Sequence, residues 1–139
     1  MGGNAKKKKI LVVDDEASFC SLLKLNLERR GPFEVLTTSN PHVVVKLAKE
    51  NQPDLILLDI LMPEMDGMTV AAGLKGNKYT EDIPIAFLTA LADEEEVRNI
   101  KYHTGDKYIL SKLGTNEELM TSVAKILTTN ASGKKSQFE

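Results

Sequence analysis

The sequence predicts a doubly wound α/β fold, in which helices cover both faces of a parallel sheet. Short apolar runs of strand length alternate five times with segments whose apolar residues recur at helical spacing. These runs are continuous rather than alternating, as expected for strands that are buried on both faces. A chain of 139 residues has room for one such domain with a core of its own.

Five segments have the composition of buried strands: residues 10–13, 33–37, 54–58, 85–88 and 108–110. The segments between and after them predict helices through residues 19–27, 44–48 and 67–75, from the acidic residues 93–96 onward, and through 119–127. Gly31 is expected to end the first helix. Thr115 or Asn116 is expected to cap the last one.

Candidate site residues follow four of the five predicted strands. Right-handed crossovers bring the carboxyl ends of parallel strands to one edge of a sheet, and sites form beyond that edge. The residues in these positions are Asp14 and Asp15 after the first strand, Asp59 after the third, Thr89 after the fourth and Lys112 after the fifth. Each alone would suit a helix cap, a turn or a solvated charge. Together they predict a site.

The residue types at this edge indicate phosphoryl chemistry with a metal ion. Clustered carboxylates repel one another and therefore need a cation. Oxygen ligands suit a hard ion, and Mg²⁺ binds through one or two carboxylates together with waters and phosphate oxygens. A carboxylate can also act as a nucleophile and form an aspartyl-phosphate. An amine and a hydroxyl nearby can bind the remaining phosphoryl oxygens.

Three motifs resemble the receiver domains of the response-regulator family: ILVVDDE (residues 10–16), DLILLDILMPEMDG (54–67) and IPIAFLTA (83–90). The resemblance covers residues 9–128. It implies a flavodoxin-like (βα)5 sandwich with a five-stranded parallel sheet in the order 2-1-3-4-5. Residues 1–8 and 129–139 are then expected to be a basic and a polar tail without regular structure.

The resemblance also implies the role of each residue. Asp59 would accept the phosphoryl group from a histidine kinase or a phosphotransfer protein. Thr89 would be a switch hydroxyl, and Lys112 would pair with the phosphate. The ligands of a Mg²⁺ or Mn²⁺ ion would be Asp14, Asp15, Asp59 and the backbone carbonyl of Leu61. Such a domain catalyses only its own phosphorylation and dephosphorylation and is not a conventional enzyme.

The segment around Lys112 departs from the family pattern. Family members usually have proline after this lysine and an aromatic residue three positions before it, whereas Leu113 follows here and Tyr108 lies four positions before. A cis bond before a residue other than proline costs about 2.5–4 kcal/mol. We therefore expect a trans Lys112–Leu113 peptide. Tyr108 is expected to pack toward the core or the last helix instead of beside Thr89.

Three other functions are compatible with parts of the pattern. A phosphohydrolase of the haloacid-dehalogenase type also uses an aspartate nucleophile, but it needs a second acid at the position of Leu61. A flavin or nucleotide binder needs a loop of N–H groups after the first strand, where Asp14 and Asp15 would repel phosphate. A degenerate receiver would act only as a binding module.

Composition limits the remaining possibilities. The formal net charge of −2 gives no broad electrostatic reason to expect nucleic acid as a partner, and the basic run at 6–9 suits a solvated tail. No stretch approaches the roughly 18 apolar residues of a membrane span. The single cysteine, Cys20, suits packing in a reducing compartment. We expect a cytoplasmic protein.

The family pattern predicts an output surface on the fourth helix, the fifth strand and the fifth helix, including Arg98, Lys101, Lys107 and Tyr108. Phosphorylation could also promote a homodimer. His42 and His103 have no partner at ligand spacing, which favours surface or capping roles. Whether the domain stands alone or belongs to a larger regulator or hybrid kinase is left open by the sequence.

Overall fold

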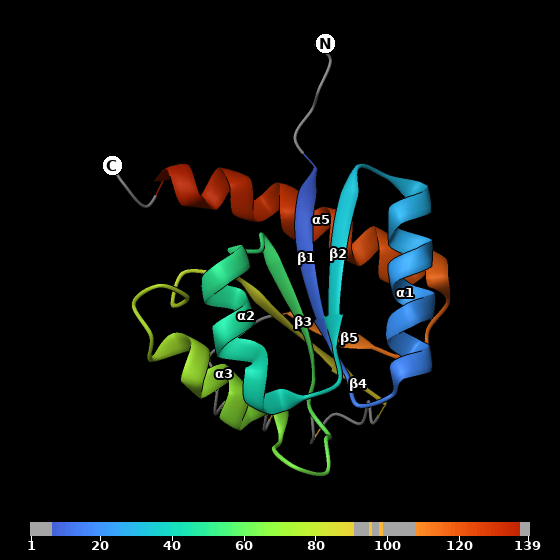
Figure 1. The fold of residues 1–139 in the computed structure, drawn as a ribbon. Coiled ribbons are helices and arrows are strands. Elements are labelled where there is room, and N and C mark those ends of the chain that lie inside the picture. Colours follow the sequence, from blue (N-terminus) through green and yellow to red (C-terminus); the bar gives the residue numbers. More distant parts are fainter. Residues whose placement is uncertain (1–6, 91–94, 96–97, 99–107, 137–139) are drawn as a thin grey trace.

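The fold was obtained as a computed structural model, which describes residues 7–90, 95, 98 and 108–136, with side chains up to residue 129. Five parallel strands form one sheet in the order β2-β1-β3-β4-β5 (Figure 1). The strands are β1 (Lys8–Val13), β2 (Phe33–Thr38), β3 (Leu55–Asp59), β4 (Ile85–Thr89) and β5 (Ile109–Ser111). The predicted fold class and strand order are confirmed.

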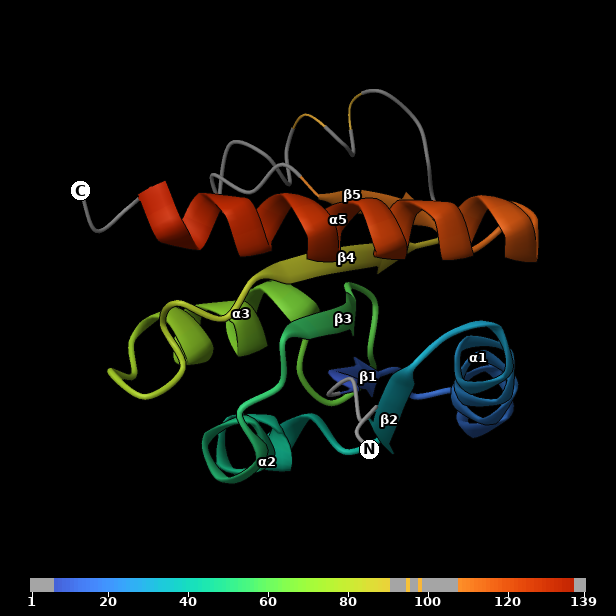
Figure 2. The same cartoon turned by 90° about the horizontal axis from the view of Figure 1, so that it is seen from above.

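Helices connect the strands and cover the sheet on both faces (Figure 2). They are α1 (Ala17–Arg30), the short 3₁₀ helix η1 (Pro41–Val43), α2 (Val44–Asn51), α3 (Gly67–Lys75) and α5 (Asn116–Ser136). The helix expected from residues 93–96 onward lies outside the described residues, apart from Glu95 and Arg98. No helix in the described ranges is long and apolar enough to cross a membrane.

The sheet separates two apolar cores. One core joins the strands to α1 and α5 through residues such as Val12, Leu57 and Val123. The other joins the opposite sheet face to α2 and α3 through residues such as Leu58 and Phe87. Neighbouring residues of a strand point to opposite faces, so Leu57 and Leu58 enter different cores. This explains why the central strands are continuously apolar.

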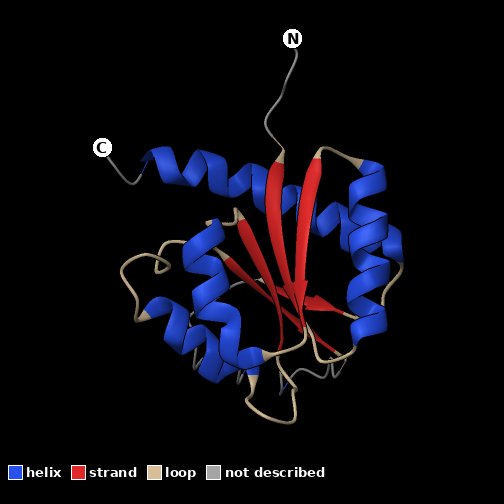
Figure 3. Cartoon of the chain, viewed as in Figure 1, coloured by secondary structure: helices blue, strands red, loops and turns tan. Residues whose placement is uncertain are grey.

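Figure 3 shows where the helices begin and end, and local signals set several of these boundaries. Thr115 Oγ1 accepts a hydrogen bond from the Glu118 N–H at 3.1 Å, and Glu118 Oε1 accepts one from the Thr115 N–H at 2.9 Å. This reciprocal capping box starts α5, as predicted for Thr115. Asp66 caps α3 by accepting from the Thr69 N–H at 2.8 Å. Gly31 follows the last residue of α1, as expected.

The expectation of an unstructured end is wrong for residues 129–136, because α5 continues to Ser136. Once a helix is nucleated and held by packing, each added residue gains a backbone hydrogen bond at little cost. The capping box and the buried residues Val123 and Leu127 provide that anchor. The polar composition of the end therefore does not stop the helix. At the other end β1 begins at Lys8, inside the predicted tail.

Candidate functional site

The polar residues predicted to converge do lie at one edge of the sheet. Asp14 directly follows β1, and Asp59 is the last residue of β3. Thr89 ends β4, where it pairs in register with Ser111, the last residue of β5. Lys112 comes next, and its N–H donates to the Thr89 carbonyl at 2.9 Å. The parallel register thus brings residues far apart in the sequence to one place.

Asp14, Asp15 and Asp59 form an acidic cluster. One carboxylate oxygen from each lies within 4.8 Å of the others. Asp14 and Asp59 are buried, whereas Asp15 is exposed. Burial, followed by the charge of Asp14, raises the pKa of Asp59 to about 7, against the opposing effect of Lys112. A cation bound between these oxygens would relieve both the desolvation and the repulsion.

The donor set fits a hard divalent ion. Within the described part of the chain, Asp14 Oδ2 accepts no well-aligned hydrogen bond, although the Lys112 ammonium lies 2.8 Å away. Asp14 Oδ1 accepts from the Glu16 N–H at 2.9 Å, which fixes the carboxylate. A buried oxygen with spare accepting capacity beside two further carboxylates is suited to Mg²⁺ or Mn²⁺. The acidic cluster is therefore consistent with a metal site.

Lys112 supplies the positive charge of the site. Its ammonium lies 2.8 Å from Asp14 Oδ2, 2.7 Å from Glu16 Oε1 and 3.8 Å from Asp59 Oδ2. Burial disfavours the charged amine, but the carboxylates of Asp14 and Glu16 outweigh it and raise the pKa of Lys112. The lysine therefore stays protonated and faces the candidate acceptor.

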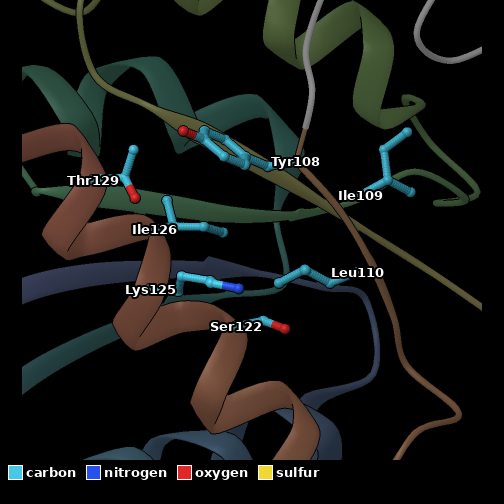
Figure 4. Close-up of a pocket in the computed structure, with 7 residues that line it drawn as sticks. All are labelled: Tyr108, Ile109, Leu110, Ser122, Lys125, Ile126 and Thr129. Carbon is cyan, nitrogen blue, oxygen red and sulfur yellow. The ribbon is translucent and has the colours of Figure 1, made fainter. Parts of the chain in front are cut away.

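The segment around Lys112 agrees with the two expectations for it, a trans peptide after Lys112 and the packing of Tyr108. The described residues contain no cis peptide bond, so the Lys112–Leu113 bond is trans, as expected. Tyr108 packs against the core between the sheet and α5. Figure 4 shows its ring beside Ile126 and Thr129 of α5, with Ile109 pointing to the other side. The predicted orientation of Tyr108 is confirmed.

Hydrogen bonds and close packing constrain the backbone around Asp59. The Leu61 N–H donates to Asp59 Oδ1 at 3.2 Å. A Cβ atom on Gly67 would lie 2.3 Å from the carbonyl oxygen of Asp59, so only glycine lets α3 start this close to the strand end. The Gly67 N–H also donates to the Ile60 carbonyl at 2.8 Å. The side chain of Leu61 is 50% exposed and carries no proton-transfer group.

Three residues near the site were not assigned roles from the sequence. Glu16 contacts Lys112 directly, and the Lys112 ammonium lies 4.7 Å from the centre of the Phe19 ring. Gly67 gives α3 its close approach. Glu16 and Gly67 lie within the motifs that carry the resemblance, and that position was the available signal. Nothing in the spacing of Phe19 separates it from ordinary packing residues.

Cys20 and His42 have the structural roles expected of them. Cys20 is buried in α1, and burial, followed by the charge of Asp14, raises the pKa of its thiol to about 11, so it packs as a neutral group. His42 is on the surface, 3.6 Å from Glu64. Met62 and Met65 pack on the core beneath α3. His103, Lys101 and Lys107 lie outside the described residues.

A doubly wound sheet with an acidic cluster, an ammonium and a buried hydroxyl at its carboxyl edge defines a class of phosphoryl-accepting proteins. Comparison with known proteins identifies the family within this class. The family described as "Response regulator receiver domain" matches residues 10–124. This chain belongs to the response regulator receiver domain family, whose members are signalling phosphoacceptors rather than conventional enzymes. The hydrolase and cofactor-binding alternatives are thereby set aside.

Individual relatives support the same family. The alkaline phosphatase synthesis transcriptional regulatory protein PhoP of Bacillus subtilis is 40% identical over 120 residues, which are 86% of this chain and 48% of that protein. The transcriptional regulatory protein SrrA of Staphylococcus aureus is 39% identical over 123 residues, 88% of this chain and 49% of that protein. The chain thus spans about half the length of these curated relatives.

A solved structure shows the same fold. The signal receiver domain of a signal transduction histidine kinase from Syntrophus aciditrophicus is 31% identical, with a TM-score of 0.76. The match covers 88% of this chain and 91% of that one. Receiver domains similar to this chain therefore occur both in transcriptional regulators and in a histidine kinase.

Proposed function

We propose that Asp59 is the phosphoryl acceptor of this receiver domain. The observation that carries the proposal is the geometry at the end of β3. Asp59 lies in a cluster of three carboxylates within 4.8 Å of one another, and the Lys112 ammonium lies 3.8 Å from its Oδ2. A nucleophile, a place for a cation and a fixed positive charge are thus adjacent.

Each residue has a defined part in the transfer. A carboxylate oxygen of Asp59 forms the new bond to phosphorus while the bond to the donor's imidazole nitrogen breaks, and the electron pair leaves on that nitrogen. Asp14, Asp15, Asp59 and the carbonyl of Leu61 are the proposed ligands of Mg²⁺ or Mn²⁺. The ion would offset the charge of the phosphoryl oxygens. Lys112 would pair with one of those oxygens.

Thr89 is the proposed switch residue. It is buried at the end of β4, in register with the end of β5 and one strand away from Asp59. A phosphoryl oxygen on Asp59 would offer the Thr89 hydroxyl a charged acceptor that exists only in the phosphorylated state. Such a differential contact can shift a two-state equilibrium. The shift would pass to β5 and α5.

The acceptor is tested by chemical phosphorylation. Incubation with acetyl phosphate and Mg²⁺ should add one phosphoryl group by intact mass spectrometry, and Asp59→Asn should abolish the addition. Asp82→Asn is the matched control, because Asp82 is an exposed aspartate in the loop that precedes β4. EDTA should prevent labelling of the parent. Asp15→Ala should weaken metal binding more than it weakens folding. Labelling retained in Asp59→Asn would refute the assignment.

The donor is proposed to be a histidine kinase or a phosphotransfer protein, and the setting is proposed to be cytoplasmic. The proposed output surface is formed by the fourth helix, β5 and α5, with Tyr108 and Arg98 as members; the fourth helix lies largely outside the described residues. Phosphorylation could pair two copies through this surface. Light scattering with and without beryllofluoride and Mg²⁺ tests that step. An unchanged mass at micromolar concentration would exclude the homodimer.

A further inference from the structure

The side chain of Lys112 crosses from the end of β5 to the end of β1 although its own loop gives it little support. Lys112 is followed by Leu113, which is 74% exposed, and then by Gly114. The side chain of Lys112 is nevertheless largely withdrawn from solvent, with 10% of its surface exposed. A lysine side chain has a long, flexible stem, so a single conformation needs contacts that hold it. Those contacts must come from elsewhere in the fold.

Two residues at the start of α1 provide them. Glu16 Oε1 accepts a hydrogen bond from Lys112 Nζ at 2.7 Å, across 96 positions of sequence. The ring of Phe19 lies beneath the same ammonium, with its centre 4.7 Å away. An aromatic face attracts a cation at this distance. Asp14, at 2.8 Å, is the third neighbour, but it is also a proposed metal ligand.

The ammonium has three N–H donors, which these contacts do not exhaust. One donor is bound to Glu16, and a second faces Asp14. Asp59 Oδ2, at 3.8 Å, is beyond hydrogen-bond distance. A phosphoryl oxygen attached to Asp59 would extend from that carboxylate into the space near the third donor. The held position of Lys112 therefore suits the phosphorylated state without large movement.

We propose that Glu16 and Phe19 are positioning residues, which hold the Lys112 ammonium where it meets the phosphoryl group on Asp59. The inference rests on the proposed function of Asp59. Glu16 is 61% exposed and is not a proposed metal ligand, so its carboxylate remains available to Lys112 when a cation occupies Asp14. The hydrogen bond that Lys112 donates to Glu16 and the ring of Phe19 replace the support that the exposed loop after Lys112 does not give.

The affinity for beryllofluoride, measured by titration with excess Mg²⁺, tests the proposal. Glu16→Ala should weaken binding about two- to fivefold, the range of a solvent-exposed ion pair. Glu16→Gln keeps an acceptor for the ammonium and should recover most of the loss. Phe19→Leu keeps the apolar volume but removes the ring face, and should weaken binding by a similar factor. Glu50→Ala removes an exposed glutamate of α2 and is the control for net charge.

The position of Lys112 has a direct readout. In the parent protein with Mg²⁺, the ¹⁵N–¹H signal of the Lys112 ammonium should be observable by NMR, because exchange with water is slowed by burial and hydrogen bonding. It should broaden or disappear in Glu16→Ala and persist in Glu50→Ala. Tighter beryllofluoride binding in Glu16→Ala would mean that Glu16 restrains the lysine, and would overturn the proposal. Unchanged beryllofluoride binding together with an unchanged Lys112 signal in Glu16→Ala would also overturn the proposal.

The acceptor role of Asp59 and the positioning role of Glu16 and Phe19 are refuted by different results. If the parent protein itself does not bind beryllofluoride with Mg²⁺, the proposed function of Asp59 is wrong. If the parent binds and Lys112→Ala weakens binding, but neither Glu16→Ala nor Phe19→Leu does, then the acceptor site stands and the positioning role is wrong. Circular dichroism of each variant separates either result from a loss of folding.

Discussion

The bodies of the central strands and their carboxyl ends are equally buried but chemically opposite. Ile10–Val13 of β1 and Leu55–Leu58 of β3 are apolar and fully buried. The next residue in each case, Asp14 or Asp59, is also buried but carries a carboxyl group. Burial of the apolar residues stabilises the fold, at about 25 cal/mol per Å² of surface removed from water. Burial of a charge opposes folding unless the charge is paired.

The difference shows how a stable scaffold carries a site that is unfavourable by itself. The strand bodies hold the register, and the register brings the ends together whatever their chemistry. Lys112 compensates part of the negative charge, but burial, followed by the charge of Asp14, still raises the pKa of Asp59. A bound divalent cation would offset the remaining negative charge and that of an incoming phosphoryl group. Substitutions in the two regions should therefore have opposite effects on stability.

The largest effect should come from the strand body. Leu57→Ala removes a fully buried side chain from the core beneath α1 and α5, and should lower the free energy of unfolding by about 2–5 kcal/mol. Urea denaturation with an unchanged m-value measures the loss. Leu113→Ala, at an exposed position, should change stability by less than about 0.5 kcal/mol. Equal losses in the two variants would contradict the location of the core.

At the strand end the sign should reverse. Asp59 has a folded-state pKa of about 7 against a usual value of 3.8, so the folded protein binds this proton more tightly than the unfolded chain. Its contribution to stability is present below about pH 4 and is lost as the pH rises toward 7. Asp59→Asn, which is neutral throughout, should therefore be more stable than the parent by about 1–3 kcal/mol at pH 8 in metal-free buffer.

The pH and metal dependence of that gain are as informative as its size. The gain should shrink toward zero near pH 4, and Mg²⁺ should reduce it at pH 8 because metal binding stabilises the parent. Thermal or urea unfolding between pH 4 and pH 8, with EDTA or Mg²⁺, checks both trends. Asp82→Asn should show neither. A gain that is independent of pH would mean that the charge of Asp59 is not its source.

Thr89→Ala should have a smaller effect on stability and a specific effect on switching. Loss of the buried hydroxyl should cost about 1 kcal/mol. Thr89→Ala should still accept the phosphoryl group, but the NMR shifts of β5 and α5 on beryllofluoride binding should be reduced. Thr80→Ala is the matched control, because Thr80 Oγ1 is buried and donates to the Leu74 carbonyl at 2.6 Å. Full-sized shifts in Thr89→Ala would remove the switch role.

The smallest effect is expected at an exposed pair. Glu28 accepts hydrogen bonds from the Val35 N–H and from Lys24, and these contacts lower its pKa. Its contribution is therefore present above the usual glutamate pKa and is lost as the pH falls below it. Glu28→Gln should lower stability at pH 7 by about 0.5 kcal/mol or less, and by less still in 1 M salt. A loss as large as that of Leu57→Ala would show that exposed charge matters more here than burial.

Three features could be predicted before the structure was known: the strand order expected from the family, the four helices that the described residues allow to be compared, and the set of residues at the carboxyl edge. Short, continuous apolar runs rich in β-branched residues, such as Ile10–Val13, indicate buried strands, and residues that follow parallel strands share an edge. The trans Lys112–Leu113 peptide followed from the energy of an amide bond. These rules need only the types of residue and the order of the segments along the chain.

The contacts between side chains of distant segments became known only from the folded structure. The contact from Glu16 to Lys112 spans 96 positions, and no periodicity in the sequence encodes it. The raised pKa of Asp59 depends on burial and on Asp14, which another strand supplies. The length of α5 was missed because a polar end looks unstructured when the anchored helix before it is ignored. In each case the physical reason is that the deciding interaction joins segments distant in the chain, or propagates from a segment already held by packing.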